Sequence, residues 1–149
     1  MGTSEPPEPI DLTKFGPTVR CPPVLIQPGT ESFSVYEEDE VSAFNLKHQA
    51  TIADTAAECG SEGGVMTIKV GIRGRVLSGP KSTVGEVPLP LRVAVTQDGA
   101  TVVYSELHTI ATDLTETETS RAWAKVVENI QVPDQGTLRI LVGFDESAS

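Results

Sequence analysis

Apolar and polar residues alternate with a period of two along much of this chain. The clearest run covers residues 66–76, where apolar side chains at even positions alternate with mostly polar ones that include Lys69, Arg73 and Arg75. Successive side chains of a β-strand point to opposite faces, so this pattern predicts a half-buried antiparallel strand with the three cations on its solvent face. Residues 89–95 alternate in the same way. The alternation indicates an all-β fold.

Turn residues separate the strand-like runs. Asp98-Gly99 lies between two of them, and Asp-Gly in that position is a strong hairpin signal. Residues 60–64 predict a second hairpin turn, and residues 71–74, with a glycine at each end, predict an irregularity within a strand. We expect strands over residues 23–27, 32–36, 44–57, 65–77, 88–97, 100–111, 123–132 and 137–144. About seven or eight short strands predict an antiparallel two-sheet sandwich of immunoglobulin or fibronectin-III-like architecture, although the Cys…Trp…Cys order of true immunoglobulin domains is missing.

One segment, residues 119–130, fits two structures. Trp123, Val126, Val127 and Ile130 are spaced as on one face of a helix, and Thr119 or Ser120 could cap it. A strand that begins near Trp123 and has an irregular start is the alternative. The β pattern on both sides of the segment favours the strand.

The chain has the length of one domain. Its 149 residues can bury a single ordinary core. Residues 1–20 are rich in proline and acidic side chains, which predicts an extended tether, and Met1-Gly2-Thr3-Ser4 resembles a start introduced by cloning. We therefore expect a tether followed by one β-sandwich domain over residues 21–149.

The net charge excludes some partners. At −10 it disfavours general binding to nucleic acid, since the phosphate backbone selects for clustered cations, and it also disfavours adhesion to an anionic membrane surface. No stretch of the sequence has the length and hydrophobicity of a membrane span.

The two cysteines, Cys21 and Cys59, predict a structural disulfide. There is no third cysteine and no Cys-x-x-Cys spacing, and each cysteine lies at the end of a strand-like run, which suits a bridge between neighbouring strands. Such a bridge places the domain outside a reducing cytoplasm. From the first expected strand to the third, it would close a loop of about 38 residues.

Several short motifs together resemble a group of uncharacterised alphaproteobacterial envelope lipoproteins. They are residues 20–26, residues 50–53 with Cys59, residues 91–96 and residues 140–144, so the similarity spans residues 20–144. The resemblance implies a secreted, lipid-anchored β-sandwich with a Cys–Cys bridge, located in the periplasm and held at the outer membrane through an N-terminal lipid anchor that this sequence lacks. It implies no activity and no catalytic residues. Residues 84–88 are less aromatic here than is usual in the group.

Candidate chemistry is sparse in the sequence. Glu37-Glu38-Asp39-Glu40 is a weak candidate calcium loop, although a solvated acidic turn explains it better. His48 falls on the inward parity of its strand with Phe44, Leu46 and Ala50, and neither it nor His108 has the spacing of a metal site. No nucleophile motif is present, so we expect no cofactor and no enzymatic activity.

Together these features predict a non-enzymatic envelope domain that acts through contacts with a protein partner. The candidate contact face carries Lys69, Arg73, Arg75 and Arg92, if residues 65–77 and 88–97 share a sheet. The alternative for those side chains is pairing with carboxylates such as Glu106 on neighbouring strands. The alternative function is a sandwich that binds sugar, lipid or calcium in its end loops, over residues 37–42, 60–64, 78–87 and 113–118.

Overall fold

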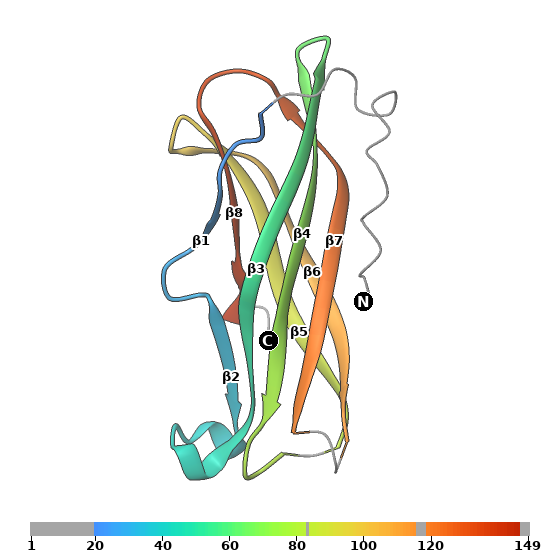
Figure 1. Ribbon diagram of the computed structural model, residues 1–149. Coiled ribbons are helices and arrows are strands. Elements are labelled where there is room, and N and C mark those ends of the chain that lie inside the picture. The colour runs from blue at the N-terminus through green and yellow to red at the C-terminus, as the bar shows by residue number, and fades with distance from the viewer. Residues whose placement is uncertain (1–19, 83, 116–118, 147–149) are drawn as a thin grey trace, which may run out of the picture.

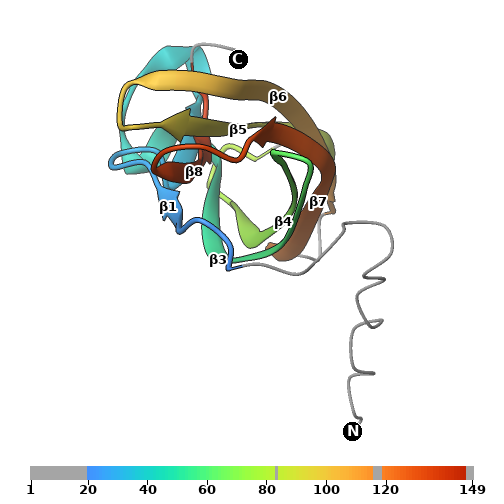
Figure 2. The same ribbon diagram turned by 90° about the horizontal axis from the view of Figure 1, so that it is seen from above.

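The protein is a two-layer β-sandwich (Figures 1 and 2). A computed structural model describes residues 20–82, 84–115 and 119–146. The strands are β1 (Val24–Ile26), β2 (Ser32–Tyr36), β3 (Leu46–Glu62), β4 (Val65–Ser78), β5 (Gly85–Gln97), β6 (Thr101–Leu114), β7 (Ser120–Pro133) and β8 (Leu138–Phe144), with 3-10 turns η1 (Glu37–Asp39) and η2 (Ala43–Asn45).

Each layer is a four-stranded sheet. Sheet A has the order β2-β3-β4-β7 and sheet B the order β1-β8-β5-β6. All pairings are antiparallel except that of β1 with β8. The predicted antiparallel two-sheet sandwich is therefore confirmed, whereas the tether expected over residues 1–20 lies, apart from Arg20, outside the described residues.

Both predicted hairpins are present. Asp98 and Gly99 have positive φ values of 54° and 81° and join β5 to β6, and Gly63 and Gly64, with φ values of 62° and 79°, join β3 to β4. Two positive φ angles match the right-handed twist of the flanking strands. Because β3 continues to Glu62, the second turn is tighter than residues 60–64 indicated, and Cys59 lies inside the strand.

The inward faces of both sheets form one hydrophobic core. Alternation along β4 and β5 places an apolar side chain inward at nearly every second position, as the period-two pattern predicted. The fully buried core side chains include Ile68, Val70, Val76, Leu89, Leu91, Val93, Val95, Ile130 and Ile140. The expected irregularity at residues 71–74 is on the partner strand instead, where β3 has an extra residue between Ile52 and Asp54.

Gly74 allows β4 to pack closely against its neighbours. A Cβ there would collide with the carbonyl oxygen of Thr51 and lie 2.7 Å from Trp123 Cζ2. The indole of Trp123 in turn packs edge-on against Phe144 in the other sheet, with ring centroids 5.8 Å apart. This contact joins the two sheets.

The chain changes sheets between its first two strands. β1 runs parallel to β8 in sheet B, and β2 then pairs with the first part of β3 in sheet A (Figure 1). The crossing segment passes so close to β8 that a Cβ on Gly143 would collide with the Thr30 side chain.

The disulfide joins the two sheets. Cys21 precedes β1, and Cys59 lies in β3, with Cα atoms 5.3 Å apart and a sequence separation of 38. The predicted pairing is confirmed, but the bridge links strands of different sheets, because β1 pairs with β8 rather than with β3. It closes the side of the sandwich at which the chain crosses between layers.

The ambiguous segment is a strand, β7, with a bulge. Trp123 and Val127 point into the core, as does Ile130, whereas Val126 is 52% exposed. The register against β4 shifts between Ile68 and Val70, and Asn129 at this point has a φ of 60°. The bulge changes which parity faces inward, so a strand reproduces most of a helical spacing.

Candidate functional site: the outer face of sheet A

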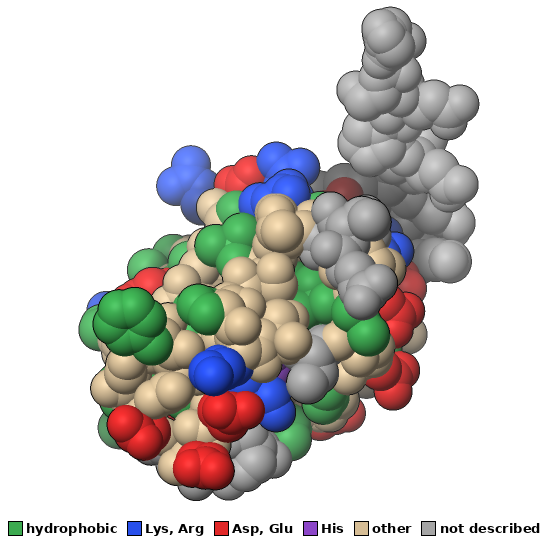
Figure 3. All heavy atoms as spheres, turned by 90° about the horizontal axis from the view of Figure 1, so that it is seen from below, with side chains coloured by type: hydrophobic (Ala, Val, Ile, Leu, Met, Phe, Trp, Pro, Cys, Tyr) green, Lys and Arg blue, Asp and Glu red, His purple; other side chains and the backbone are tan. Residues whose placement is uncertain are grey.

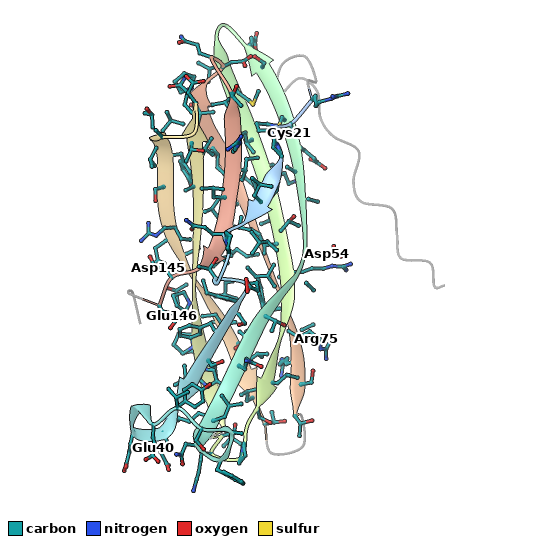
Figure 4. The ribbon with its side chains drawn as sticks, turned by 90° about the vertical axis from the view of Figure 1, so that its left-hand side faces the viewer. Cys21, Glu40, Asp54, Arg75, Asp145 and Glu146 are labelled. Atoms are coloured by element: carbon teal, nitrogen blue, oxygen red, sulfur yellow. A yellow bond between two sulfur atoms is a disulfide. The ribbon has the colours of Figure 1, made fainter. Side chains whose placement is uncertain are left out.

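Three of the four predicted cations share one surface. Lys69, Arg73 and Arg75 alternate along β4 on the outer face of sheet A. Arg92 does not join them, because β5 pairs with β6 and β8 in sheet B, so the expected single sheet is wrong. Figure 4 shows Asp54 and Arg75 on the opposite side of the sandwich from Asp145 and Glu146, which follow β8.

The cations on sheet A have local partners. Arg73 donates to Asp54 Oδ2 from Nε at 3.2 Å and Nη2 at 2.6 Å. Lys69 Nζ lies 3.9 Å from Glu128 Oε1. Arg75 donates from Nε and Nη2 to Ser120 Oγ at 2.8 and 2.6 Å. This is cross-strand pairing of the kind offered as the alternative to a free basic patch, but its carboxylates are Asp54 and Glu128.

An apolar trough lies between these paired charges. Ala56 of β3, Gly71 of β4, and Ala124 and Val126 of β7 line a hollow of about 370 Å³. The register places Gly71 beside both Ala56 and Val126, and a Cβ at Gly71 would meet no atom within 4 Å. The trough exists because small side chains occupy outward positions on three adjacent strands. We refer to these four residues as the sheet A trough.

The trough could not be predicted from residue types alone, because it depends on which outward residues become neighbours across strands. The alanines and the glycine of the trough become neighbours only through the register of three strands. The bulge in β7 also made the orientation of Val126 hard to predict. A helix over this segment would have placed Val126 on the apolar face with Trp123, whereas in the strand it is exposed.

Arg92 belongs to a separate surface on sheet B. Its Nε donates to Asp145 Oδ2 at 2.7 Å and its Nη1 donates to Ser105 Oγ at 3.0 Å. A groove of about 300 Å³ beside this pair is partly formed by Thr30 and Gly143, where the crossing segment passes β8. Its polar groups are largely committed to one another.

The acidic loop lies at the lower end of the sandwich (Figures 1 and 3). Glu37 Oε1 lies 3.9 Å from Lys81 Nζ, and Glu40 donates its N–H to the carbonyl of Glu37. Figure 3 shows acidic and hydrophobic side chains intermixed at this end, and Val41 and Phe44 are each 79% exposed. Within the part of the chain that the structure describes, no three histidines, cysteines or carboxylates converge as a metal site would require.

The candidate end loops do not form one cluster. Residues 37–42 and the connection after β4 lie at the lower end, whereas the β3–β4 hairpin lies at the upper end (Figure 1). Residues 85–87 and 113–114 belong to strands β5 and β6. Residue 83 and residues 116–118 of the candidate loops lie outside the described residues.

The histidines occupy separate sites. His48 contributes to a groove of about 320 Å³ with Phe33, Pro90 and Leu107, and burial lowers its pKa. The inward parity holds for Ala50, which is buried, but not for Phe44, because β3 begins at Leu46 and Phe44 lies in η2.

His108 shares the inner side of β6 with Tyr104 and Glu106. Tyr104 donates its hydroxyl to Glu106 Oε2 at 3.0 Å, and burial together with this bond raises the pKa of Tyr104 to about 12. His108 Nε2 is buried and has no hydrogen-bond partner among the described residues. This group lies away from the sheet A trough, on the other sheet.

Comparison with protein-family models, with curated proteins and with solved structures finds no match to this chain. The disulfide fits an extracytoplasmic domain. In the described ranges, no helix has the length and apolar character needed to cross a membrane.

Proposed function

We propose that this protein is a non-enzymatic module that acts outside the cytoplasm by binding a protein partner through the outer face of sheet A. The observation that carries the proposal is the sheet A trough, an apolar hollow of about 370 Å³ bordered by charged residues of both signs. An apolar centre within a polar rim is the anatomy of a protein–protein contact.

The composition of the rim favours a protein over other partners. Arg73 and Asp54 have side chains that are 71% and 59% exposed, so both ends of the pair can exchange partners with an incoming surface. A molecule with a net charge of −10 is a poor ligand for nucleic acid or for anionic lipid. Rim charges of this kind steer association and set specificity more than they add affinity.

The cellular setting forms part of the proposal. The resemblance of residues 20–144 to envelope lipoproteins supports a bacterial envelope location, with the domain held in the periplasm by an N-terminal lipid anchor. An accessory subunit of an envelope assembly would need a contact surface and no chemistry. The partner is then another envelope protein.

Site-directed photo-cross-linking in the cells that naturally produce the protein tests this function. A photoreactive phenylalanine at Ala122, beside Arg75 on sheet A, is compared with one at Ala111 on the outer side of sheet B. We expect one discrete protein adduct from Ala122 and none from Ala111. Gly71→Leu adds a Cβ that meets no atom within 4 Å and an apolar side chain within the trough, so it should reduce the adduct about tenfold and leave the melting temperature unchanged.

The matched control is Thr67→Leu, which adds the same side chain to the outer face of β4 outside the trough. It should leave the adduct intact. Equal adducts from both sheets, or full adduct formation by Gly71→Leu, would contradict the proposal. A rise in melting temperature with calcium or cell-wall sugars, without any adduct, would favour the ligand-binding alternative.

A further inference from the structure

Strand β3 has an open edge beside the trough. β2 pairs with β3 only as far as Thr51, and Ile52 donates its N–H to the carbonyl of Glu31, which lies just after the chain arrives from sheet B and just before β2 begins. Within the described residues, Ala53–Glu58 has strand partners only in β4. Figure 4 looks onto this side of the sandwich, where β2 covers only the lower part of β3. The edge is open because the chain crosses between sheets.

The register identifies the groups on this edge. After the extra residue at Ala53, Asp54 pairs with Arg73, Ala56 with Gly71 and Glu58 with Lys69. Before the bulge, the backbone N–H of Ile52 points away from β4, toward the β2 side. After the bulge the alternation resumes, so the backbone groups of Thr55 and Ala57 point to that same side. Their N–H and C=O groups point away from β4, as the template for another strand requires.

The outward side chains along the edge indicate which residues an added strand would need. Ala56 lines the trough, and Asp54 is held by Arg73. Glu58 is half-buried and has no hydrogen-bond or ion-pair partner among the described residues, since the Lys69 ammonium lies near Glu128 instead. A half-buried carboxylate without a partner favours an incoming cation.

We propose that the partner contributes an extended segment that pairs antiparallel with β3 over Ala53–Glu58, an inference that rests on the proposed function. A lysine or arginine of the segment lies opposite Glu58, and two residues later a large apolar side chain lies opposite Ala56 and covers the trough. Backbone hydrogen bonds to an exposed edge supply affinity in this mode, and alternate side chains supply specificity. A second copy of this chain fits poorly, because it would bring its own Asp54 and Glu58 to an already acidic edge.

A synthetic peptide tests the inference directly. The capped peptide Thr-Lys-Val-Leu-Val-Thr carries the basic residue and the leucine at the required spacing. We expect amide hydrogen exchange at Thr55 and Ala57 to slow when the peptide is added at about 1 mM, with no protection of β6. Peptides methylated on backbone nitrogens that face β3 should lose the effect.

Charge reversal identifies the side-chain contact. Glu58→Lys should weaken peptide binding about tenfold, and a peptide with glutamate in place of lysine should recover binding to this variant. Glu62→Lys, the same change on β3 beyond the open edge, is the matched control and should have little effect. Equal losses in both variants, or no recovery on charge exchange, would overturn the contact.

Different experimental results would contradict the pairing at the β3 edge and the proposed function. Ala57→Pro removes an edge N–H without removing a bond to β4, and it should abolish peptide binding. If this variant does not fold, the methylated peptides answer the same question in the unaltered protein. Absence of protection at Thr55 and Ala57, together with a trough-dependent adduct at Ala122, would overturn the edge inference and leave the proposed function standing. Equal adducts from Ala122 and Ala111, or full adduct formation by Gly71→Leu, would overturn the proposed function itself.

Discussion

At the scale of single residues, two histidines make the stability of the fold depend on pH. Burial lowers the pKa of His48, with a smaller contribution from Lys47. Burial also lowers the pKa of His108, which Glu106 opposes and Lys125 reinforces. Such a histidine binds protons more readily in the unfolded chain. Its contribution to stability is complete above its ordinary pKa of about 6.5 and is lost as the pH falls toward the folded value.

We therefore predict that the free energy of unfolding falls between about pH 7.5 and about pH 5 and that the fall is smaller in the variant His48→Gln/His108→Gln. Urea denaturation at several pH values measures both slopes. His48→Gln alone should remove only part of the dependence, since the two histidines lie in different sheets. Identical slopes in the unaltered and doubly substituted proteins would show that carboxylates, not histidines, set the pH response.

At the scale of elements, the bulge in β7 determines which side chains of that strand face the core and which face the trough. Asn129 has a φ of 60°, in the left-handed region that asparagine and glycine tolerate and β-branched residues do not. The extra residue leaves both Val127 and Ile130 in the core while Val126 remains on the trough. Because of the bulge, β7 contributes neighbouring apolar residues both to the core and to the outer face.

Asn129→Val should destabilise the fold by about 1–2 kcal/mol because valine strains at this φ, whereas Asn129→Gly should change it by less than about 0.5 kcal/mol. Chemical denaturation gives both values. Gln131→Val, at an exposed position of β7 that has no positive φ, is the matched control and should be neutral or slightly stabilising. Equal losses at positions 129 and 131 would mean that β propensity, not backbone strain, explains the first result.

Local signals in the sequence predicted the elements better than their partners. Alternation identified β4 and β5, and Asp98-Gly99 identified their neighbouring hairpin, because these patterns depend on a few adjacent residues. The helical spacing near Trp123 misled because a bulge shifts parity. The placement of Arg92 failed for another reason: no local feature shows that the connection from β4 to β5 crosses between sheets.

The candidate site was predictable from the sequence only in part. Lys69, Arg73 and Arg75 were predictable as one solvent-facing row from their parity alone. Their partners Asp54 and Glu128, and the trough beside them, depend on the register of β3 and β7 against β4. The register of β3 follows from its hairpin with β4 only as far as the extra residue at Ala53, which no local signal predicted. The register of β7, which is distant from β4 in sequence, is set by the packing of the whole core.

At the scale of the whole molecule, the crossing from sheet B to sheet A is the feature that links stability to the candidate contact. β1 ties the start of the domain to β8, and the bridge from Cys21 to Cys59 then ties that start to β3. Because of the same crossing, Ala53–Glu58 has no strand partner on the side away from β4 among the residues that the structure describes. The bridge therefore anchors the upper end of the edge at which a partner strand would add.

Removing the bridge should lower the free energy of unfolding by about 3–4 kcal/mol, the value expected for release of a loop of 38 residues. For a domain of this size the melting temperature should fall by roughly 10 °C. Calorimetry of Cys21→Ala/Cys59→Ala measures the loss, and reduction of the unaltered protein should match it. Thiol titration is the control: oxidised protein should show no reactive thiols, and two that react before reduction would contradict the bridge. If reduction left the melting temperature unchanged, packing of Val24 and Ile26 against the core would suffice to hold the sheets together there.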